Sequence, residues 1–335
     1  MKKGFWISIG LMVILVTVLG FTTTFGSFAA GPYKKATIAM TYIPNVQFAP
    51  WYVAADKGFF KTEGLDVNFD YRMDIDALPL VASGKIDFAI AGGDQVITAR
   101  SHDIPVVYLA TLYAKFPPAI IALSKSGIKT PKDLKGKKIG LPLYGTSLLA
   151  VKAILNKAGI SEKDVQLIDV GYTQISSLTS GKVDAVVGFA NNEPLNLTAQ
   201  GYSINQIDSW HYFPLVGHGL ITGKGTLAAN PKMVQAMVRA TVKGMKYALG
   251  HPSEAYAICL KYVPDISKDS QGLQQKILQS SMELWENEFT EQYGLGMSDP
   301  KGWADSQKSI HQYGLIDKET PVKEMLNLKF IPKKQ

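Results

Sequence analysis

The chain has 335 residues, of which 46% are hydrophobic, and its 35 basic and 28 acidic side chains give a net charge of +7 at pH 7. Its single cysteine, Cys259, excludes an internal disulfide. The basic residues are scattered, and their one short run, at 135–138, has no interleaved aromatic residues, so we expect no nucleic-acid binding. The five histidines show no paired metal-ligand spacing and no Gly-x-Ser-x-Gly motif occurs. We therefore expect no catalytic residue, metal or cofactor.

The N-terminus has the pattern of a targeting segment. Lys2 and Lys3 precede an apolar run over 5–21, and small residues lead to Ala30. We predict a signal peptide over 1–29, and because the apolar run approaches the length of a membrane span, an uncleaved anchor is the alternative. Either places the protein outside the cytoplasm, in secreted, periplasmic or membrane-tethered form. Roughly 305 residues remain, which is enough for two domains.

Strand and helix patterns alternate from residue 34 to residue 207, which is typical of α/β layers with mostly parallel strands. Strands are predicted over 34–40, 65–71, 88–91, 105–110 and 119–123, and in a second unit over 138–141, 165–170, 183–189 and 204–207. Helices are predicted over 48–57, 76–83, 96–101, 146–158 and 174–180. From residue 231 the chain is mainly helical, over 233–249, 253–262, 271–285 and 301–313.

Two segments, 120–126 and 216–223, are candidates for crossings between the units. Two crossings make a hinge with a cleft between lobes, and closure of such a hinge around a ligand is a known switching mode. The sequence therefore predicts an α/β, two-lobed fold. Lobe 1 would be discontinuous, with residues 34–121 and 222–335, and lobe 2 would hold residues 122–221.

Loops at the predicted strand ends carry polar residues, and open α/β sheets bind ligands beyond the carboxyl ends of their strands. In the first loop Tyr42 offers a ring face and a hydroxyl, and Asn45 offers a donor and an acceptor. An ordinary turn with a helix cap is the alternative for Asn45. The second loop holds Gly93, which permits close approach of a ligand, and Asp94. Asp94 is a candidate ligand contact, and we also expect it to cap a helix.

The third loop, Tyr144, Gly145, Thr146 and Ser147, opens a predicted helix. Free backbone N–H groups and the two hydroxyls there could receive an anionic or carbonyl oxygen, although simple capping by Thr146 and Ser147 explains the same residues.

The fourth loop, Asn191, Asn192 and Glu193, follows a fully apolar strand. Amide and carboxyl groups together match the polar edge of a heterocycle. Turn chemistry explains the paired asparagines but does not call for a glutamate followed by Pro194.

Aromatic side chains complete the predicted binding site. Each aromatic face that stacks on a flat ligand contributes about 0.5–1.5 kcal/mol beyond burial. The candidates are Tyr42, Trp51, Tyr113, Phe116, Tyr172 and Phe189. His218, in the second crossing, could also face the cleft. The alternative for Trp51 is a structural role in the protein core, and the alternative for His218 is an ordinary solvated or core histidine.

These motifs resemble a known family. Segments 42–54, 57–67, 83–89, 133–140 and 191–194 look like those of extracytoplasmic solute-binding proteins of ABC importers. The branch is the one for thiamine pyrimidine precursors and riboflavin, which borders the alkanesulfonate and nitrate binders, and the resemblance covers about residues 35–260. It implies a periplasmic-binding-protein-like (type II) fold, and permease subunits with a cytoplasmic ATPase as partners of a monomeric binding protein. It also implies that Tyr42 and Asn45 contact a flat nitrogen heterocycle from one lobe, and Asn191 and Glu193 from the other.

The chain departs from parts of this family. Thiamine-precursor binders tend to have Trp before Pro-Asn and His shortly after it, where this chain has Tyr42 or Ile43 and Gln47 or Phe48. The amino-acid sequence of this loop, residues 42–50, looks more like that of the riboflavin binders. Fungal relatives make the pyrimidine and carry a cysteine-rich iron-binding motif, which one cysteine cannot reproduce. We therefore expect a binding protein and not an enzyme, with a sulfonate or another small anion as the alternative ligand. A pyrimidine-synthesising enzyme is the third and least favoured alternative.

Overall fold

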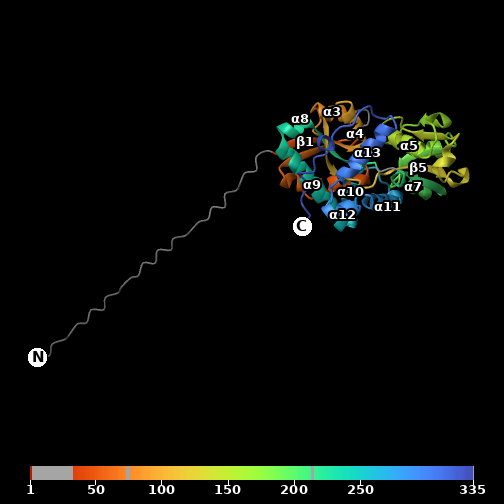
Figure 1. The fold of residues 1–335 in the computed structure, drawn as a ribbon. Coiled ribbons are helices and arrows are strands. Elements are labelled where there is room, and N and C mark those ends of the chain that lie inside the picture. Colours follow the sequence, from red (N-terminus) through yellow and green to blue (C-terminus); the bar gives the residue numbers. More distant parts are fainter. Residues whose placement is uncertain (2–32, 73–75, 213–214, 335) are drawn as a thin grey trace. The chain divides into compact units, whose positions relative to one another are not determined.

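The structure, a computed structural model, describes residues 1, 33–72, 76–212 and 215–334. The predicted signal peptide or anchor lies, apart from Met1, outside the described residues. The fold is that of the body formed by residues 33–334 (Figure 1). No helix within the described residues combines the length and the hydrophobicity that a membrane crossing requires.

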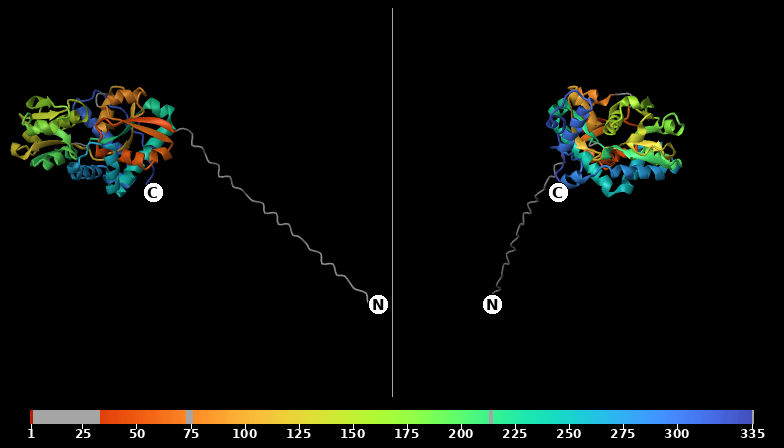
Figure 2. Two further views of the ribbon diagram at one scale, coloured as in Figure 1. Left: turned by 180° about the vertical axis from the view of Figure 1, so that it is seen from behind. Right: turned by 45° about the vertical axis from the view of Figure 1, so that its right-hand side comes forward.

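The body contains two five-stranded sheets. The first has the order β2-β1-β3-β10-β4 and consists of β1 (Lys34–Ala39), β2 (Leu65–Asp70), β3 (Phe88–Gly92), β4 (Val106–Thr111) and β10 (His218–Gly223). The second has the order β7-β6-β8-β5-β9 and consists of β5 (Pro118–Leu123), β6 (Lys138–Leu141), β7 (Gln166–Asp169), β8 (Ala185–Phe189) and β9 (Ile204–Asp208). Figures 1 and 2 show the second sheet, in yellow and green, at one end of the body.

Each sheet contains one strand that runs against its neighbours. β1 is parallel to β2 and β3, whereas β10 is antiparallel to β3 and β4. In the second sheet β6 is parallel to β7 and β8, whereas β5 is antiparallel to β8 and β9. Both reversed strands directly follow a passage of the chain from one sheet to the other. The fold is thus a mixed α/β fold with two similar sheets.

The passages between the sheets precede the segments predicted for them. The chain leaves the first sheet after Thr111 and enters the second at Pro118, and it returns between Asp208 and His218. Segment 120–126 begins within β5, and segment 216–223 is mostly β10. Local sequence does not locate the passages, because a buried apolar strand has the same composition in either sheet. We propose lobe limits at 112–117 and 209–217, in place of residues 121 and 222.

Helices pack on the two sheets. The helices that alternate with strands β1 to β9 along the chain are α1 (Ala49–Asp56), α2 (Phe59–Thr62), α3 (Ala77–Ala82), α4 (Gly93–Ser101), α5 (Gly145–Lys157), α6 (Gln174–Thr179) and α7 (Glu193–Ala199). The 3-10 turn η1 (Val46–Phe48) precedes α1. The C-terminal ones are α8 (Lys224–Ala229), α9 (Pro231–Gly250), α10 (Pro252–Tyr262), α11 (Gln271–Met282), α12 (Glu288–Tyr293), α13 (Pro300–Gln312) and α14 (Val322–Met325). Helix α11 contacts both η1 and α7, so it touches elements that follow strands of both sheets.

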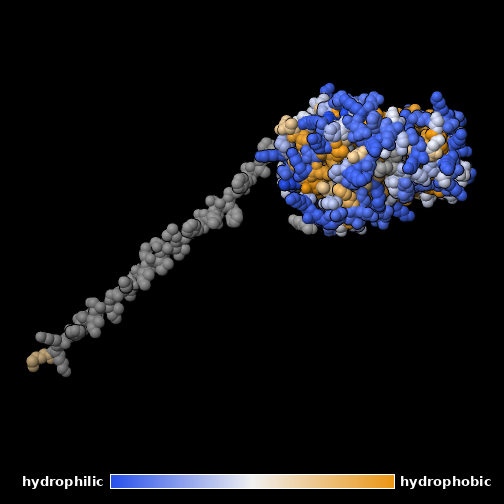
Figure 3. All heavy atoms as spheres, in the orientation of Figure 1, coloured by the Kyte–Doolittle hydropathy of each residue, from blue (hydrophilic) through white to orange (hydrophobic). Residues whose placement is uncertain are grey.

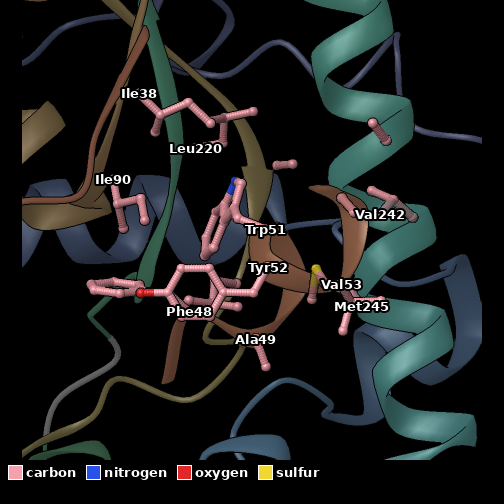
Figure 4. Packing of buried hydrophobic residues seen from close by; sticks show 14 of the residues in the cluster. Ile38, Phe48, Ala49, Trp51, Tyr52, Val53, Ile90, Leu220, Val242 and Met245 are labelled. Atoms are coloured by element: carbon pink, nitrogen blue, oxygen red, sulfur yellow. The ribbon is translucent and has the colours of Figure 1, made fainter. Parts of the chain in front are cut away.

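The largest hydrophobic cluster lies where α1 packs between the first sheet and α9 (Figure 4). Trp51 and Tyr52 of α1 are fully buried there, and Val242 and Met245 of α9 lie against the same helix. A Cβ atom on Gly244 would lie 2.0 Å from the Pro50 carbonyl oxygen, so the close approach of the two helices needs glycine. On the face shown in Figure 3, hydrophilic residues surround smaller hydrophobic patches.

Candidate functional site

A cavity of 920 Å³ is lined by residues that follow strands of both sheets. Ten of the predicted site residues line it: Tyr42, Tyr113, Gly145, Thr146, Ser147, Tyr172, Phe189, Asn192, Glu193 and His218. This placement is the one that strand-end loops of two facing lobes produce. Further lining residues were not predicted from the sequence, among them Gln47, Gln95, Tyr144 and Gln174. Tyr144 opens the third predicted loop, although it was not among the predicted ligand contacts.

Tyrosines form one wall of the cavity. The Tyr42 and Tyr172 rings lie 5.7 Å apart between centroids with a 55° tilt, and the Tyr144 hydroxyl donates to the Tyr172 hydroxyl at 3.1 Å. Burial, helped by the negative charge of Glu193, raises the pKa of Tyr42 to about 12. Burial also raises the pKa of Tyr172. Both phenols are therefore neutral hydrogen-bonding groups at pH 7 on rings that can stack on a flat ligand.

Glu193 places a carboxyl group at the start of α7. Only 9% of the residue is exposed, and its Oε2 accepts the Phe189 backbone N–H at 2.6 Å. Burial raises the pKa of Glu193, although the hydrogen bond from Phe189 acts in the opposite direction. A Cβ atom on Gly188 would lie 2.8 Å from Cγ of Glu193, so a glycine in β8 leaves the space that this side chain occupies. The local structure therefore fixes the carboxyl group at the cavity wall.

His218 begins β10 and adds an imidazole to the wall. Its ring lies 5.3 Å from that of Phe189 and 6.2 Å from that of Tyr113 between centroids. Burial lowers the pKa of His218 to about 4, so the ring is neutral at pH 7. Its buried Nδ1 has no hydrogen-bond partner among the described residues.

Asp94 and Thr146 face each other from α4 and α5. The Thr146 hydroxyl donates to Oδ1 of the fully buried Asp94 at 3.2 Å, and burial raises the pKa of Asp94 to about 7. The expectation that Asp94 caps α4 is wrong: Gly92 is the cap residue, and Gln95 Oε1 accepts its N–H at 2.9 Å. Capping of α5 by Thr146 and Ser147 is also wrong, because the helix begins at Gly145 and has Tyr144 as its cap residue.

Asn191 is fully buried and lies outside the residues that line the cavity. Its Nδ2 lies 2.9 Å from Oε1 of Gln47, 3.2 Å from the Tyr113 hydroxyl and 2.7 Å from Oγ of Ser281. The Tyr113 hydroxyl also donates to the same Gln47 oxygen at 2.9 Å. Asn191 therefore joins the loop after β8 to η1, to the first passage between the sheets, and to α11.

The remaining predicted residues also lie away from the 920 Å³ cavity. Trp51 and Phe116 are buried in hydrophobic clusters. A Cβ atom on Gly93 would lie 2.4 Å from Cγ1 of Val216, so close packing requires this glycine. Asn45 caps η1, with Oδ1 accepting the Gln47 N–H at 3.1 Å.

A second cavity, of 550 Å³, adjoins the first. Five residues line both cavities: Tyr42, Tyr172, Gln174, Asn192 and Glu193. Asn45 lines the second cavity, together with amide and hydroxyl side chains of α6, α7 and α11. The two cavities can thus hold different parts of one ligand. No group of three His, Cys, Asp or Glu side chains within the described residues could hold a metal ion.

The paired lobes and the cavity between their loops are those of the periplasmic-binding-protein fold. A family model described as "NMT1/THI5 like" matches residues 45–255, and the chain belongs to this family. It is similar to the riboflavin-binding protein RibY of Chloroflexus aurantiacus, with 34% identity over 97% of both chains. It is also similar to the formylaminopyrimidine-binding protein of Halalkalibacterium halodurans, with 30% identity over 68% of this chain and 70% of the relative.

A solved structure of similar fold is the periplasmic aliphatic sulphonate binding protein SsuA of Escherichia coli. Its TM-score is 0.66 at 14% identity, and the match covers 90% of this chain and 95% of that one. This likeness shows the two-lobed fold and does not bear on the ligand.

Proposed function

We propose that the protein is the extracytoplasmic binding component of an ABC importer and that it captures a flat nitrogen heterocycle, either riboflavin or a thiamine pyrimidine precursor. The observation that carries this proposal is the 920 Å³ cavity, in which the aromatic rings of Tyr42 and Tyr172 lie near the buried carboxyl group of Glu193. The similarity to binding proteins for riboflavin and for formylaminopyrimidine supports it.

The proposed mode of binding uses stacking and edge recognition. Tyr42, Tyr172 and Phe189 offer ring faces, and Glu193 and Asn192 offer acceptors and donors for the N–H and carbonyl groups of the ring edge. A site with such buried polar groups rejects analogues that lack the matching groups, because its own groups are then left unpaired.

The lobes would close around the ligand and release it by opening at 112–117 and 209–217. The hydrogen bond between Thr146 and Asp94 joins elements of the two lobes and would form on closure. Since each lobe supplies part of the cavity wall, the ligand makes its full set of contacts only in the closed state, and this difference in binding free energy drives the equilibrium toward closure.

The partners would be permease subunits with a cytoplasmic ATPase, and the protein would act as a secreted, periplasmic or membrane-tethered monomer. It would not be an enzyme, so a bound ligand should be recovered chemically unchanged. Mass spectrometry of ligand released by denaturation checks this, and conversion of the ligand would contradict it.

A small anion such as an alkanesulfonate is the second candidate, because Gly145, Thr146 and Ser147 line the cavity at the start of α5. The charges favour the heterocycle. Of the cationic side chains at the cavity, Lys152 is 3.1 Å from a carboxylate oxygen of Glu162 and Arg72 is paired with Asp70. The buried acids Asp94 and Glu193 would also repel an anion when ionised.

Calorimetric titration with riboflavin, an aminopyrimidine precursor and an alkanesulfonate tests the proposal. We expect a heterocycle to bind, and Glu193→Gln to weaken it about tenfold or more through loss of a hydrogen bond to a charged or strongly polar acceptor. The matched control is Glu286→Gln, an exposed glutamate that should leave the affinity unchanged. Binding of the sulfonate alone, or an unchanged affinity in Glu193→Gln, would contradict the heterocycle assignment.

A further inference from the structure

The 550 Å³ cavity is lined mainly by neutral polar side chains. These include Thr173, Gln174, Ser176, Asn196, Gln200 and Gln274. Among its described lining residues there is no Lys, Arg or His, and Glu193 adds a carboxyl group. Amides and hydroxyls of this kind match the alternating donors and acceptors of a polyhydroxylated chain. The absence of a cation on this lining, together with the acid, disfavours a phosphate or a sulfonate.

Two of these amides that are buried or half-buried have no hydrogen-bond partner among the described residues. Gln174, in α6, is only 8% exposed and lines both cavities, and its side chain makes no hydrogen bond there. Gln274, in α11, is half-buried and equally unpaired, and it lines only the smaller cavity. By contrast, Asn196 donates to Oδ1 of Asn192 at 2.8 Å. Buried polar groups are usually paired, so an unpaired one facing a cavity indicates a ligand group.

The two cavities meet at shared residues. Tyr42 and Tyr172, the stacking tyrosines, line both cavities, as do Gln174 and Glu193. A flat ring held in the larger cavity would therefore direct a substituent past Gln174 toward Gln274. The geometry fits a ligand with one aromatic part and one flexible polar part.

We propose that the smaller cavity is a subsite for the neutral polyhydroxyl chain of the ligand. The side chains of Gln174 and Gln274 would hydrogen-bond this chain, one from α6 and the other from α11. This inference rests on the proposed function and narrows it. The ligand is a heterocycle carrying a polyol, as riboflavin does, and is neither a bare pyrimidine nor a phosphorylated flavin. Because Gln274 belongs to α11, the C-terminal helical region takes part in ligand selection.

Quenching of flavin fluorescence tests the subsite with three ligands that share one ring. Riboflavin carries a ribityl chain, lumiflavin has a methyl group in its place, and flavin mononucleotide has a phosphate at the end of the chain. We expect riboflavin to bind about tenfold or more tightly than lumiflavin, from several neutral hydrogen bonds. We expect flavin mononucleotide to bind more weakly than riboflavin.

Gln274→Leu is the decisive variant, because its side chain lies away from the ring cavity. It should weaken riboflavin about three- to tenfold and leave the dissociation constant of lumiflavin unchanged. Gln174→Leu should weaken riboflavin by at least as much. The matched controls are Gln275→Leu, an exposed neighbour on α11, and Gln166→Leu, an exposed residue of β7, and both should bind riboflavin as the unaltered protein does.

The outcomes separate the two proposals. Lumiflavin binding as tightly as riboflavin, tighter binding of flavin mononucleotide, or equal loss of both ligands in Gln274→Leu would overturn the subsite and leave heterocycle binding in place. Binding of an aminopyrimidine but of no flavin would do the same. Failure of every heterocycle to bind would overturn the proposed function itself.

Discussion

Nδ2 of Asn191 lies 2.7 Å from Oγ of Ser281, which places a hydrogen bond between the loop after β8 and α11. Both side chains are fully buried. Ser281 in turn donates to the Ile277 carbonyl within α11 at 2.7 Å. Residues separated by 90 positions in the chain thus share one buried polar cluster, which joins α11 to the loop after β8.

Replacing Asn191 should lower stability. Asn191→Ala removes the buried hydrogen bonds from Asn191 Nδ2 to Gln47 and Ser281, so we expect a loss of about 1–3 kcal/mol in the free energy of unfolding, measured by urea denaturation. Asn156→Ala, on the exposed face of α5, should stay within about 0.5 kcal/mol. A stability equal to that of the unaltered protein, combined with lost ligand affinity, would instead make Asn191 a ligand contact.

Asp94 should make stability depend on pH. In the folded protein burial keeps it protonated up to a pKa of about 7, against an ordinary value of 3.8. Between these values the folded state binds more protons than the unfolded state, so this group destabilises the fold by up to about 1.4 kcal/mol for each unit that the pH rises. The stability that Asp94 contributes in its protonated form is fully present below pH 3.8 and is lost as the pH rises through 7.

His218 acts in the opposite sense, because its folded pKa of about 4 lies below the ordinary value of 6.5. The stability that the neutral His218 contributes is present above pH 6.5 and is lost as the pH falls through 4.

The Asp94 prediction is checked by chemical denaturation of Asp94→Asn between pH 4 and 7. Because the variant lacks the buried carboxyl group, its stability should rise with pH relative to that of the unaltered protein. Parallel curves for the two proteins would show that Asp94 does not titrate in this range.

Gly244 should be intolerant of a side chain. Gly244→Ala places a Cβ atom where only 2.0 Å separates it from the Pro50 carbonyl oxygen, so α1 and α9 must move apart. We expect a loss of about 1–3 kcal/mol, measured as a fall in the thermal midpoint. Gly272→Ala, on an exposed position of α11 with nothing within 4 Å, should raise stability by about 0.5 kcal/mol. Equal effects of the two changes would contradict the close helix packing.

Cys259 should report on unfolding. Its thiol is fully buried in α10, and burial raises the pKa of Cys259 to about 12. Labelling by a disulfide reagent at pH 8 should therefore be on the order of a hundredfold slower in the folded protein than in urea. Rapid labelling without denaturant would show that α10 opens from the first lobe.

The strand pattern was largely readable from the sequence, because alternation and β-branched runs act locally. The helix α7 after Asn192 was not predicted, because its seven residues are too few to show a clear helical periodicity of apolar side chains. The passages between sheets were placed too late, because the apolar run of β5 reads alike in either sheet. Strand direction leaves no mark in the local sequence, which is why the reversed strands were missed.

The candidate site was predictable in its loops and less so in its residues. Tyr42 and Glu193 line the cavity, where strand-end loops should meet. Asp94 and Asn191 had the same polar signals, but both are fully buried and hydrogen-bonded to other elements. Their partners are distant in the chain, and Gln174 and Gln274 came from helices whose sequences predict only helix. Such roles depend on tertiary contacts.

The place of β10 between β3 and β4 sets an order of assembly during synthesis. All strands of the second sheet lie within residues 118–208, so that sheet can form as soon as this contiguous stretch is available. The first sheet cannot join β4 to β3 until residues 218–223 have been made and inserted between them. The lobe that begins first along the chain is therefore finished last, and until then the edges of β3 and β4 are open to incorrect pairing.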